Sequence, residues 1–120
     1  MKICITASSE GSGAAMDSRF ARAPFLVVID GETGAAETHP NEAASAGHGA
    51  GVQAAQTVSR LGAEVLLTAH CGPKAFEVLD AAGVKVFSIG SGTVSEAVEA
   101  WKAGTLTQLE GADSDAGWSG

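Results

Sequence analysis

Hydrophobic residues in the first third of the chain occur in short runs separated by glycine-rich segments. Residues 2–7 and 25–30 (FLVVID) are rich in β-branched and other apolar side chains, so each segment predicts a strand. Residues 31–34, Gly-Glu-Thr-Gly, predict a tight turn into a short third strand near residues 35–38, which pairs with the second strand as an antiparallel hairpin. Residues 8–15 are mostly Gly, Ser and Ala, and we expect them to form a flexible loop that could cover a ligand.

Beyond this hairpin, apolar residues recur at helical spacing in three segments separated by two apolar runs. We expect helices over residues 49–62, 73–83 and 93–104, each ending at a glycine, with strands over residues 64–70 and 84–89 between them. The last helix has the clearest boundary, because Thr93 and Glu96 have the spacing of a capping box.

The order of these elements predicts the fold class. Alternating helices and strands in the second half favour right-handed crossovers, with parallel strands and helices on both faces of the sheet. The hairpin makes the sheet mixed, so we predict a three-layer α/β fold with a five-stranded mixed sheet in a single domain, residues 1–109. Residues 110–120 are acidic, rich in Gly and Ser and nearly without apolar groups, and we expect this tail, including Trp118, to be disordered.

The charge of the chain limits its partners. Fourteen acidic and seven basic side chains give a formal net charge of −7, which argues against nucleic acid or an anionic membrane surface as the main partner. No apolar stretch approaches the length of a membrane span and the N-terminus does not look like a signal peptide, so we expect a soluble cytoplasmic protein. The two cysteines, Cys4 and Cys71, indicate neither a disulfide framework nor a structural zinc site.

Ligands of open α/β sheets gather beyond the carboxyl ends of the parallel strands. Here these ends are Ser8, the segment His70-Cys71-Gly72 and the segment Gly90-Ser91-Gly92, and we expect them to share one rim with three helix N-termini. The segment Gly47-His48-Gly49-Ala50-Gly51 resembles a cradle for an anion, because alternating glycines let backbone amides converge. The alternative is a flexible turn before a helix.

Basic residues concentrate near the same rim. Arg19 and Arg22 flank Phe20, and Lys74 lies in the first turn of the second predicted helix, with His48 and His70 nearby. In so acidic a chain this is a concentrated positive site. The alternative is that Arg19 and Arg22 pair with surface carboxylates.

The sequence contains few residues suited to catalysis. It has no nucleophile elbow, no HExxH motif and no paired carboxylates on a strand, so we expect a protein that is not an enzyme. Cys4 is expected in the core. Cys71 is either a buried residue or a single soft metal ligand, with His48 as a second candidate ligand, and a thiol enzyme using Cys71 is a further alternative. His39 is expected in solvent.

Several motifs in order, RFARAPFLVVID, GHGAG, HCGPKAFEVLDAAGVKVF and GTVSEAVEAWKAG, resemble the dinitrogenase iron-molybdenum cofactor biosynthesis family over residues 1–109. The chain looks most similar to the small stand-alone members of this family, one of which carries a molybdenum-copper sulfide cluster. The resemblance implies a ribonuclease H-like fold that binds metal clusters. Family members often have a histidine or arginine before this phenylalanine and a glycine after it; here these positions are Arg19 and Ala21, so a histidine ligand is absent there.

Together these patterns predict noncovalent binding or carriage of an anionic metal-sulfide cluster, of the molybdenum-copper or a related molybdenum-cofactor type. The expected site residues are Ser8, Arg19, Phe20, Arg22, His48, Gly49, Gly51, His70, Cys71, Gly72, Lys74 and Gly90. The alternative is a metal-independent module that regulates a P-loop ATPase partner. The oligomeric state is not predicted.

Overall fold

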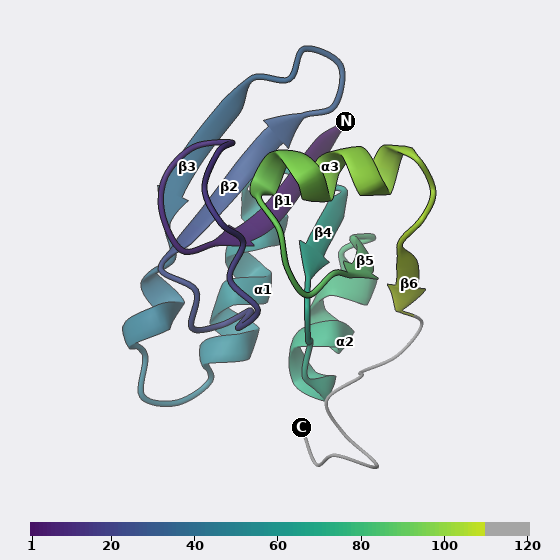
Figure 1. Cartoon of the computed structure of the whole chain (residues 1–120). Coiled ribbons are helices and arrows are strands. Elements are labelled where there is room, and N and C mark those ends of the chain that lie inside the picture. The colour runs from purple at the N-terminus through teal and green to yellow at the C-terminus, as the bar shows by residue number, and fades with distance from the viewer. Residues whose placement is uncertain (110–120) are drawn as a thin grey trace.

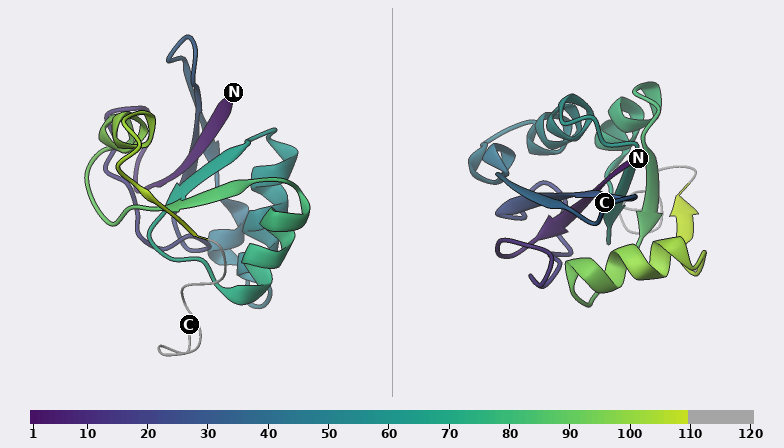
Figure 2. Two further views of the ribbon diagram at one scale, coloured as in Figure 1. Left: turned by 90° about the vertical axis from the view of Figure 1, so that its right-hand side faces the viewer. Right: turned by 90° about the horizontal axis from the view of Figure 1, so that it is seen from above.

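A mixed β-sheet between two layers of helices makes up residues 1–109, the residues that the computed structural model describes (Figure 1). Viewed from above, α1 and α2 lie on one side of the sheet and α3 lies on the other (Figure 2). The predicted tail, residues 110–120, lies outside the described residues. The elements are β1 (Lys2–Ala7), β2 (Phe25–Asp30), β3 (Ala36–Pro40), the 3-10 helix η1 (Glu42–Ser45), α1 (Ala50–Arg60), β4 (Val65–Thr68), α2 (Pro73–Ala81), β5 (Lys85–Ser88), α3 (Val94–Lys102) and β6 (Thr107–Leu109).

The strands follow the order β3-β2-β1-β4-β5-β6 across the sheet. β1 pairs parallel with β4, and β4 pairs parallel with β5. β2 is antiparallel to both β1 and β3, which confirms the predicted hairpin and the mixed sheet. Gly34, with a φ of 78°, closes the turn between β2 and β3, where its N–H donates to the carbonyl of Asp30.

The predicted number of strands is wrong for the described residues, because the sheet has six strands rather than five. The additional strand, β6, has three residues and pairs antiparallel with β5 at the edge of the sheet. Thr107 and Gln108 are exposed and only Leu109 contacts the core, so this segment has no hydrophobic period from which a strand could be predicted. The α/β class holds, whereas the ribonuclease H-like assignment stays a prediction.

Alternating strand residues divide the core into two layers. Cys4 on β1 and Leu66 on β4 face α1 and α2, whereas Ile3 and Ile5 on β1 face α3. Successive side chains of a strand point to opposite faces, so helices on both faces require nearly every residue of β1 and β4 to be buried.

α1 and α2 lie side by side on their face of the sheet (Figures 1 and 2). They contact each other closely at their N-terminal ends, where a Cβ built on Gly51 would lie 3.5 Å from the Cβ of Ala75. Both N-termini therefore open at the same end of the sheet. No helix within residues 1–109 has the length and apolar character needed to cross a membrane.

The loop over residues 8–15 differs from the flexible cover that the sequence suggested. It contacts the N-terminus of α3, where the N–H groups of Val94 and Ser95 donate to the carbonyls of Ala14 and Ser12. The Gly/Ser/Ala composition allows this close backbone approach. The loop therefore binds to a helix end on the α3 face.

Candidate functional site: a cavity between two helix ends

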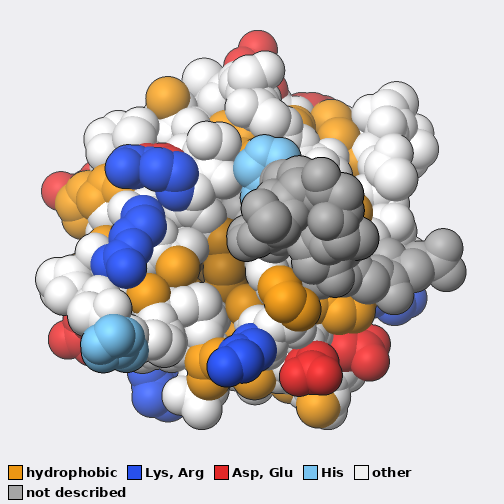
Figure 3. All heavy atoms as spheres, turned by 90° about the horizontal axis from the view of Figure 1, so that it is seen from below, with side chains coloured by type: hydrophobic (Ala, Val, Ile, Leu, Met, Phe, Trp, Pro, Cys, Tyr) orange, Lys and Arg blue, Asp and Glu red, His pale blue; other side chains and the backbone are white. Residues whose placement is uncertain are grey.

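A cavity of about 530 Å³ lies between the N-termini of α1 and α2 and the turn formed by residues 19–23, which we call the arginine turn. We refer to it as the helix-end cavity. On the face seen from below, Lys, Arg and His side chains surround a hollow in which hydrophobic side chains are visible (Figure 3). The residues that line it are Arg19, Phe20, Ala21, Arg22, Gly49, Ala50, Gly51, Val52, His70, Gly72, Pro73, Lys74 and Ala75.

Both helices present free backbone amides to the helix-end cavity. The first intrahelical bond of α1 runs from the N–H of Gln53 to the carbonyl of Gly49, and that of α2 from Phe76 to Gly72. Within residues 1–109, the preceding amides have no hydrogen-bond acceptor; they belong to Ala50, Gly51, Val52, Lys74 and Ala75. Neither helix has a side-chain cap or an acidic residue in its first turn. Free amides and the positive ends of two helix dipoles favour an anion there.

The N-terminus of α3 shows the opposite arrangement. Thr93 and Glu96 form the predicted capping box, and the amides of Val94 and Ser95 donate to the loop over residues 8–15. All the early amides of α3 thus have partners supplied by the chain. Of the three α-helices in residues 1–109, the other two, α1 and α2, lack this protection, and both open into the same cavity.

The Arg19 side chain forms a bidentate ion pair with Asp17. Its Nε lies 2.9 Å from Oδ1 and its Nη2 lies 2.7 Å from Oδ2, and the backbone N–H of Arg19 also donates to Oδ1. The Arg19 guanidinium holds the pKa of the Asp17 carboxyl below its ordinary value. The alternative of carboxylate pairing is therefore correct for Arg19, and Asp17 offsets much of its charge, although Asp17 itself is nearly buried.

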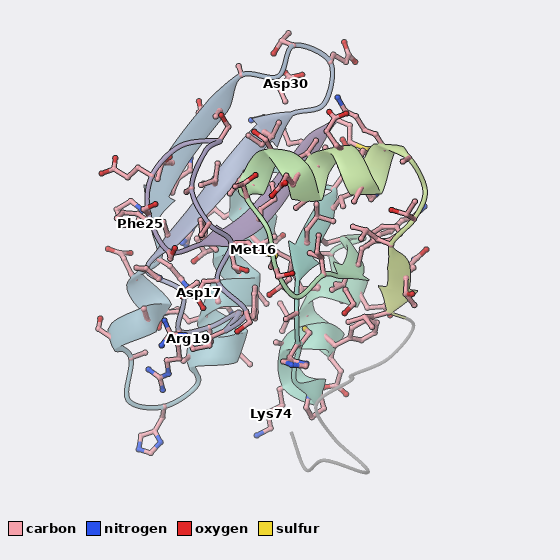
Figure 4. All side chains as sticks on the ribbon, in the orientation of Figure 1. Met16, Asp17, Arg19, Phe25, Asp30 and Lys74 are labelled. Carbon is pink, nitrogen blue, oxygen red and sulfur yellow. The ribbon has the colours of Figure 1, made fainter. Side chains whose placement is uncertain are left out.

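Arg22 and Lys74 carry charge that no carboxylate offsets within residues 1–109. The Nη1 of Arg22 donates to the carbonyls of Ala44 and Ala46, which hold the guanidinium without neutralising it. Lys74 lies in the first turn of α2, where the helix dipole disfavours a cation. Figure 4 shows that Arg19 and Lys74 extend from different elements at the same end of the molecule.

Asn41 holds the arginine turn from beneath. Its buried Nδ2 donates to the carbonyls of Phe20, Ala21 and Ala23, and its backbone N–H donates to that of Pro24. These acceptors fix the orientation of the carboxamide, because the reversed orientation would place Oδ1 against the carbonyls. Oδ1 is buried without a partner. Asn41 thus holds the backbone of the arginine turn, and sequence reasoning missed it because its partners are 18 to 21 residues away.

Eight of the twelve predicted site residues line the helix-end cavity: Arg19, Phe20, Arg22, Gly49, Gly51, His70, Gly72 and Lys74. A parallel bridge between Arg19 and His70 aligns the arginine turn with the end of β4. Ser8 and Gly90 do not line it, since Ser8 is hydrogen-bonded to Ala15 and lies in the loop on the α3 side. His48 is exposed beside Gly49, also outside the lining.

Both cysteines are buried. Burial raises the pKa of Cys4 to about 12, as expected for a core thiol. Cys71 is 1% exposed within the core layer under α1 and α2, and it follows His70 and precedes Gly72, which both line the cavity. Within residues 1–109 there is no cluster of three or more His, Cys, Asp or Glu side chains arranged to hold a metal ion.

The apolar lining of the cavity was not predicted beyond Phe20. It is formed by Ala21, Ala50, Val52, Pro73 and Ala75 together with Phe20. The apolar spacing of α1 and α2 identified which positions face the sheet, but it did not show that the first turns of the two helices meet the arginine turn. Only the packing of α1 against α2 reveals this surface.

The fold and this site define a class: a small α/β protein in which two uncapped helix ends and a cationic turn border an open pocket with a largely apolar lining. The model of the dinitrogenase iron-molybdenum cofactor family matches residues 1–104, and the chain belongs to this family.

Solved structures agree with this assignment. The apo form of the orange protein from Desulfovibrio gigas is 42% identical, with a TM-score of 0.89, covering 93% of this chain and 95% of that one. A Thermotoga protein of the DUF35 family is 35% identical, with a TM-score of 0.82, covering 96% and 98%. In sequence alone, an uncharacterised protein of Methanocaldococcus jannaschii is 24% identical over 98 residues, which are 79% of this chain and 83% of that protein.

Proposed function

We propose that this protein binds or carries an anionic metal-sulfide cluster, noncovalently, in the helix-end cavity. The proposed cargo is a molybdenum-copper sulfide cluster or a related molybdenum cofactor, as the family resemblance implies. Membership of the dinitrogenase iron-molybdenum cofactor family and the likeness to the orange protein support a metal-cluster ligand. Residues 1–109 are the proposed binding domain.

The observation that carries this proposal is the pair of uncapped helix ends that share one cavity. Five amides without acceptors would be costly if they faced only apolar surroundings, and an anion would satisfy several of them at once. Arg22 and Lys74 add positive charge in a chain whose formal net charge is −7. Three of the seven Lys and Arg residues, Arg19, Arg22 and Lys74, thus lie where the helix dipoles already favour a negative guest.

The manner of binding follows from the residues that reach the cavity. Charge, amide hydrogen bonds and shape are the proposed means of holding the cluster, with Cys71 or His48 as candidate metal ligands. Neither residue lines the cavity, so coordination by either requires a local movement of the chain when the cluster binds.

Catalysis and an ATPase partner are not part of this proposal. Relatives of this family fit a binding or carrier role, and neither the family match nor the relatives point to a P-loop ATPase. The proposed compartment is the reducing cytoplasm, which suits a chain with two cysteines in no disulfide-framework spacing.

Titration of the apo protein with tetrathiomolybdate and Cu(I) tests the proposal. We expect new visible absorption bands, together with amide chemical-shift changes at residues 19–22, 49–52 and 72–75. The amides of residues 93–96 serve as an internal control, because the chain already satisfies that helix end. Absence of binding, or shifts centred on α3, would show that the proposed function or its site is wrong.

A further inference from the structure

Strand β3 leaves one edge of the sheet without a neighbouring strand. It comes first in the order of the strands, and within residues 1–109 it pairs only with β2. Figure 1 shows it on the outer side of β2. The pairing of the two strands runs from Phe25–Pro40 to Ile29–Ala36 without a bulge. β3 therefore presents a regular strand edge.

Alternate residues of β3 direct their backbone groups away from β2. The N–H of Asn41 donates to the carbonyl of Pro24, and this bond sets the phase of the ladder. Backbone bonds alternate along an antiparallel pair, so the odd-numbered residues of β3 bond to β2. The even-numbered residues, Ala36, Thr38 and Pro40, face outward. Within residues 1–109, the amides of Ala36 and Thr38 and the carbonyls of all three have no hydrogen-bond partner.

An open edge of this kind is a template for another strand. Many proteins prevent such pairing with lysines, bulges or a covering segment along the edge. β3 contains no Lys or Arg and no bulge. The loop over residues 8–15 reaches it only through the side chain of Thr38, which accepts a hydrogen bond from the N–H of Gly11. Pro40 lacks an N–H, but it keeps its carbonyl as an acceptor.

The side chains of β3 indicate which strand fits this edge. Glu37 and His39 share the face of β3 opposite Thr38, and the His39 Nε2 lies 3.4 Å from the Glu37 Oε1. The Glu37 side chain is 70% exposed and the His39 side chain is 34% exposed. In an antiparallel pair of β3 strands centred on Thr38, each Glu37 lies opposite the partner copy's His39. A carboxylate acceptor thus meets an imidazole donor twice.

The neighbouring registers are less favourable. Antiparallel pairs that join outward groups of both copies are centred on Glu37, Thr38 or His39. The first places two carboxylates directly opposite each other, which is destabilising. The last places Thr38 opposite the partner copy's Pro40, which has no N–H to donate. The register centred on Thr38 joins the amides of Ala36 and Thr38 to the partner copy's carbonyls of Pro40 and Thr38.

We infer that β3 is the interface of a homodimer in which two copies pair antiparallel about Thr38 and form one continuous sheet. No residue of β3 lines the helix-end cavity, so both cavities stay open and the inference does not depend on the cargo. Asn41, which holds the arginine turn, directly follows the paired strand. Five residues from each copy make a small interface, so the dimer is weak and depends on concentration.

Sedimentation equilibrium of the full chain, from micromolar to millimolar concentration, tests the dimer at an ionic strength that screens the repulsion between two chains of net charge −7. Thr38→Pro removes an outward N–H and leaves the bonds to β2 in place. Thr38→Val is the matched control, because it loses the same hydroxyl but keeps the N–H. We expect Thr38→Pro to raise the dissociation constant at least about tenfold and Thr38→Val to change it little. A monomer at every concentration, or equal effects of the two variants, overturns the inference.

Exchange of the charged pair tests the register. Glu37→His places a histidine opposite the partner copy's His39, and His39→Glu places a carboxylate opposite the partner copy's Glu37. We expect each single variant to weaken the dimer severalfold and the double variant to recover it. Thermal unfolding confirms that each variant is folded. Wild-type dimerisation in both single variants, or no recovery in the double variant, overturns the pairing about Thr38. Binding of tetrathiomolybdate with Cu(I) stays unchanged throughout, and its absence from the wild type contradicts only the proposed function.

Discussion

Asp17 and Arg19 are joined by two side-chain hydrogen bonds at the edge of the helix-end cavity, although the carboxylate is nearly buried and the guanidinium is mostly exposed. The pair fixes the start of the arginine turn, because Asp17 also accepts the backbone N–H of Arg19. The excess charge of the cavity therefore comes chiefly from Arg22 and Lys74. This distribution leads to predictions about pH, charge and backbone geometry.

The Asp17–Arg19 pair should make the stability of the fold depend on pH in the acidic range. The folded-state pKa of Asp17 is lowered, first by the hydrogen bonds from Arg19, so the pair stabilises the fold above the unfolded pKa of about 4 and this contribution is lost as pH falls through the folded value. Urea unfolding at a series of pH values measures this loss. Asp17→Asn should be less stable than the wild type at neutral pH, and the difference should shrink in acid. A pH-independent difference would contradict the linkage.

Charge reversal at Arg22 should weaken cluster binding by at least about tenfold, because the cavity loses one of its two uncompensated cations. Arg22→Lys, which keeps the charge, should lose less. Arg60→Glu is the matched control, because this substitution changes the net charge by the same amount at the far end of α1. Visible titration with tetrathiomolybdate and Cu(I) gives the affinities. Similar losses in Arg22→Glu and Arg60→Glu would mean that only the net charge of the protein matters.

Asn41→Ala should destabilise the fold by about 1–3 kcal/mol, since the buried carbonyls of the arginine turn lose their common donor. It should also weaken cluster binding in the folded protein, because Arg22 and Phe20 lose their fixed positions. Chemical denaturation and a titration well below the unfolding transition separate the two effects. Ser45→Ala removes an exposed local hydrogen bond and should change neither quantity appreciably. Cluster binding at full affinity in folded Asn41→Ala would exclude the positioning role.

Gly49 and Gly47 form a natural pair for testing backbone geometry at the start of α1. Both have open space where a Cβ would lie, but only Gly49 has a left-handed φ, of 68°. Gly49→Ala should cost about 1 kcal/mol of stability and displace the free amides of the first turn, whereas Gly47→Ala should be close to neutral. Thermal unfolding and cluster titration of both variants measure the difference. Equal effects would indicate that the left-handed conformation is not needed.

Cys71→Ser distinguishes noncovalent holding from thiolate coordination. Because Cys71 is buried outside the lining of the cavity, we expect cluster affinity to be retained and stability to fall, as for other polar substitutions in a core. Cys4→Ser should behave in the same way, since Cys4 is a core thiol. Loss of cluster binding in Cys71→Ser alone would instead identify the thiolate as a ligand.

The sequence alone predicted the β2–β3 hairpin, the three helices and the parallel pairing of β1, β4 and β5. These elements follow from local periodicity and from caps such as Thr93 with Glu96 and the glycines at helix ends. It also indicated the arginine turn, the Gly47–Gly51 segment and Lys74 as parts of one site, because their glycines and basic side chains suit an anion. The short strand β6 escaped prediction, since its pairing with β5 leaves no pattern in three residues.

Only the tertiary structure decided which of these residues meet. Local sequence shows where a helix begins, but whether its first amides are satisfied depends on distant segments, and the loop over residues 8–15 satisfies α3 while α1 and α2 stay open. Likewise, only the folded chain shows that Asp17 offsets the charge of Arg19. It also shows that the hydrogen-bond partners of Asn41 lie on another segment. Sequence therefore determined the elements through local energetics, whereas contacts between remote segments determined the cavity, its charge and its apolar lining.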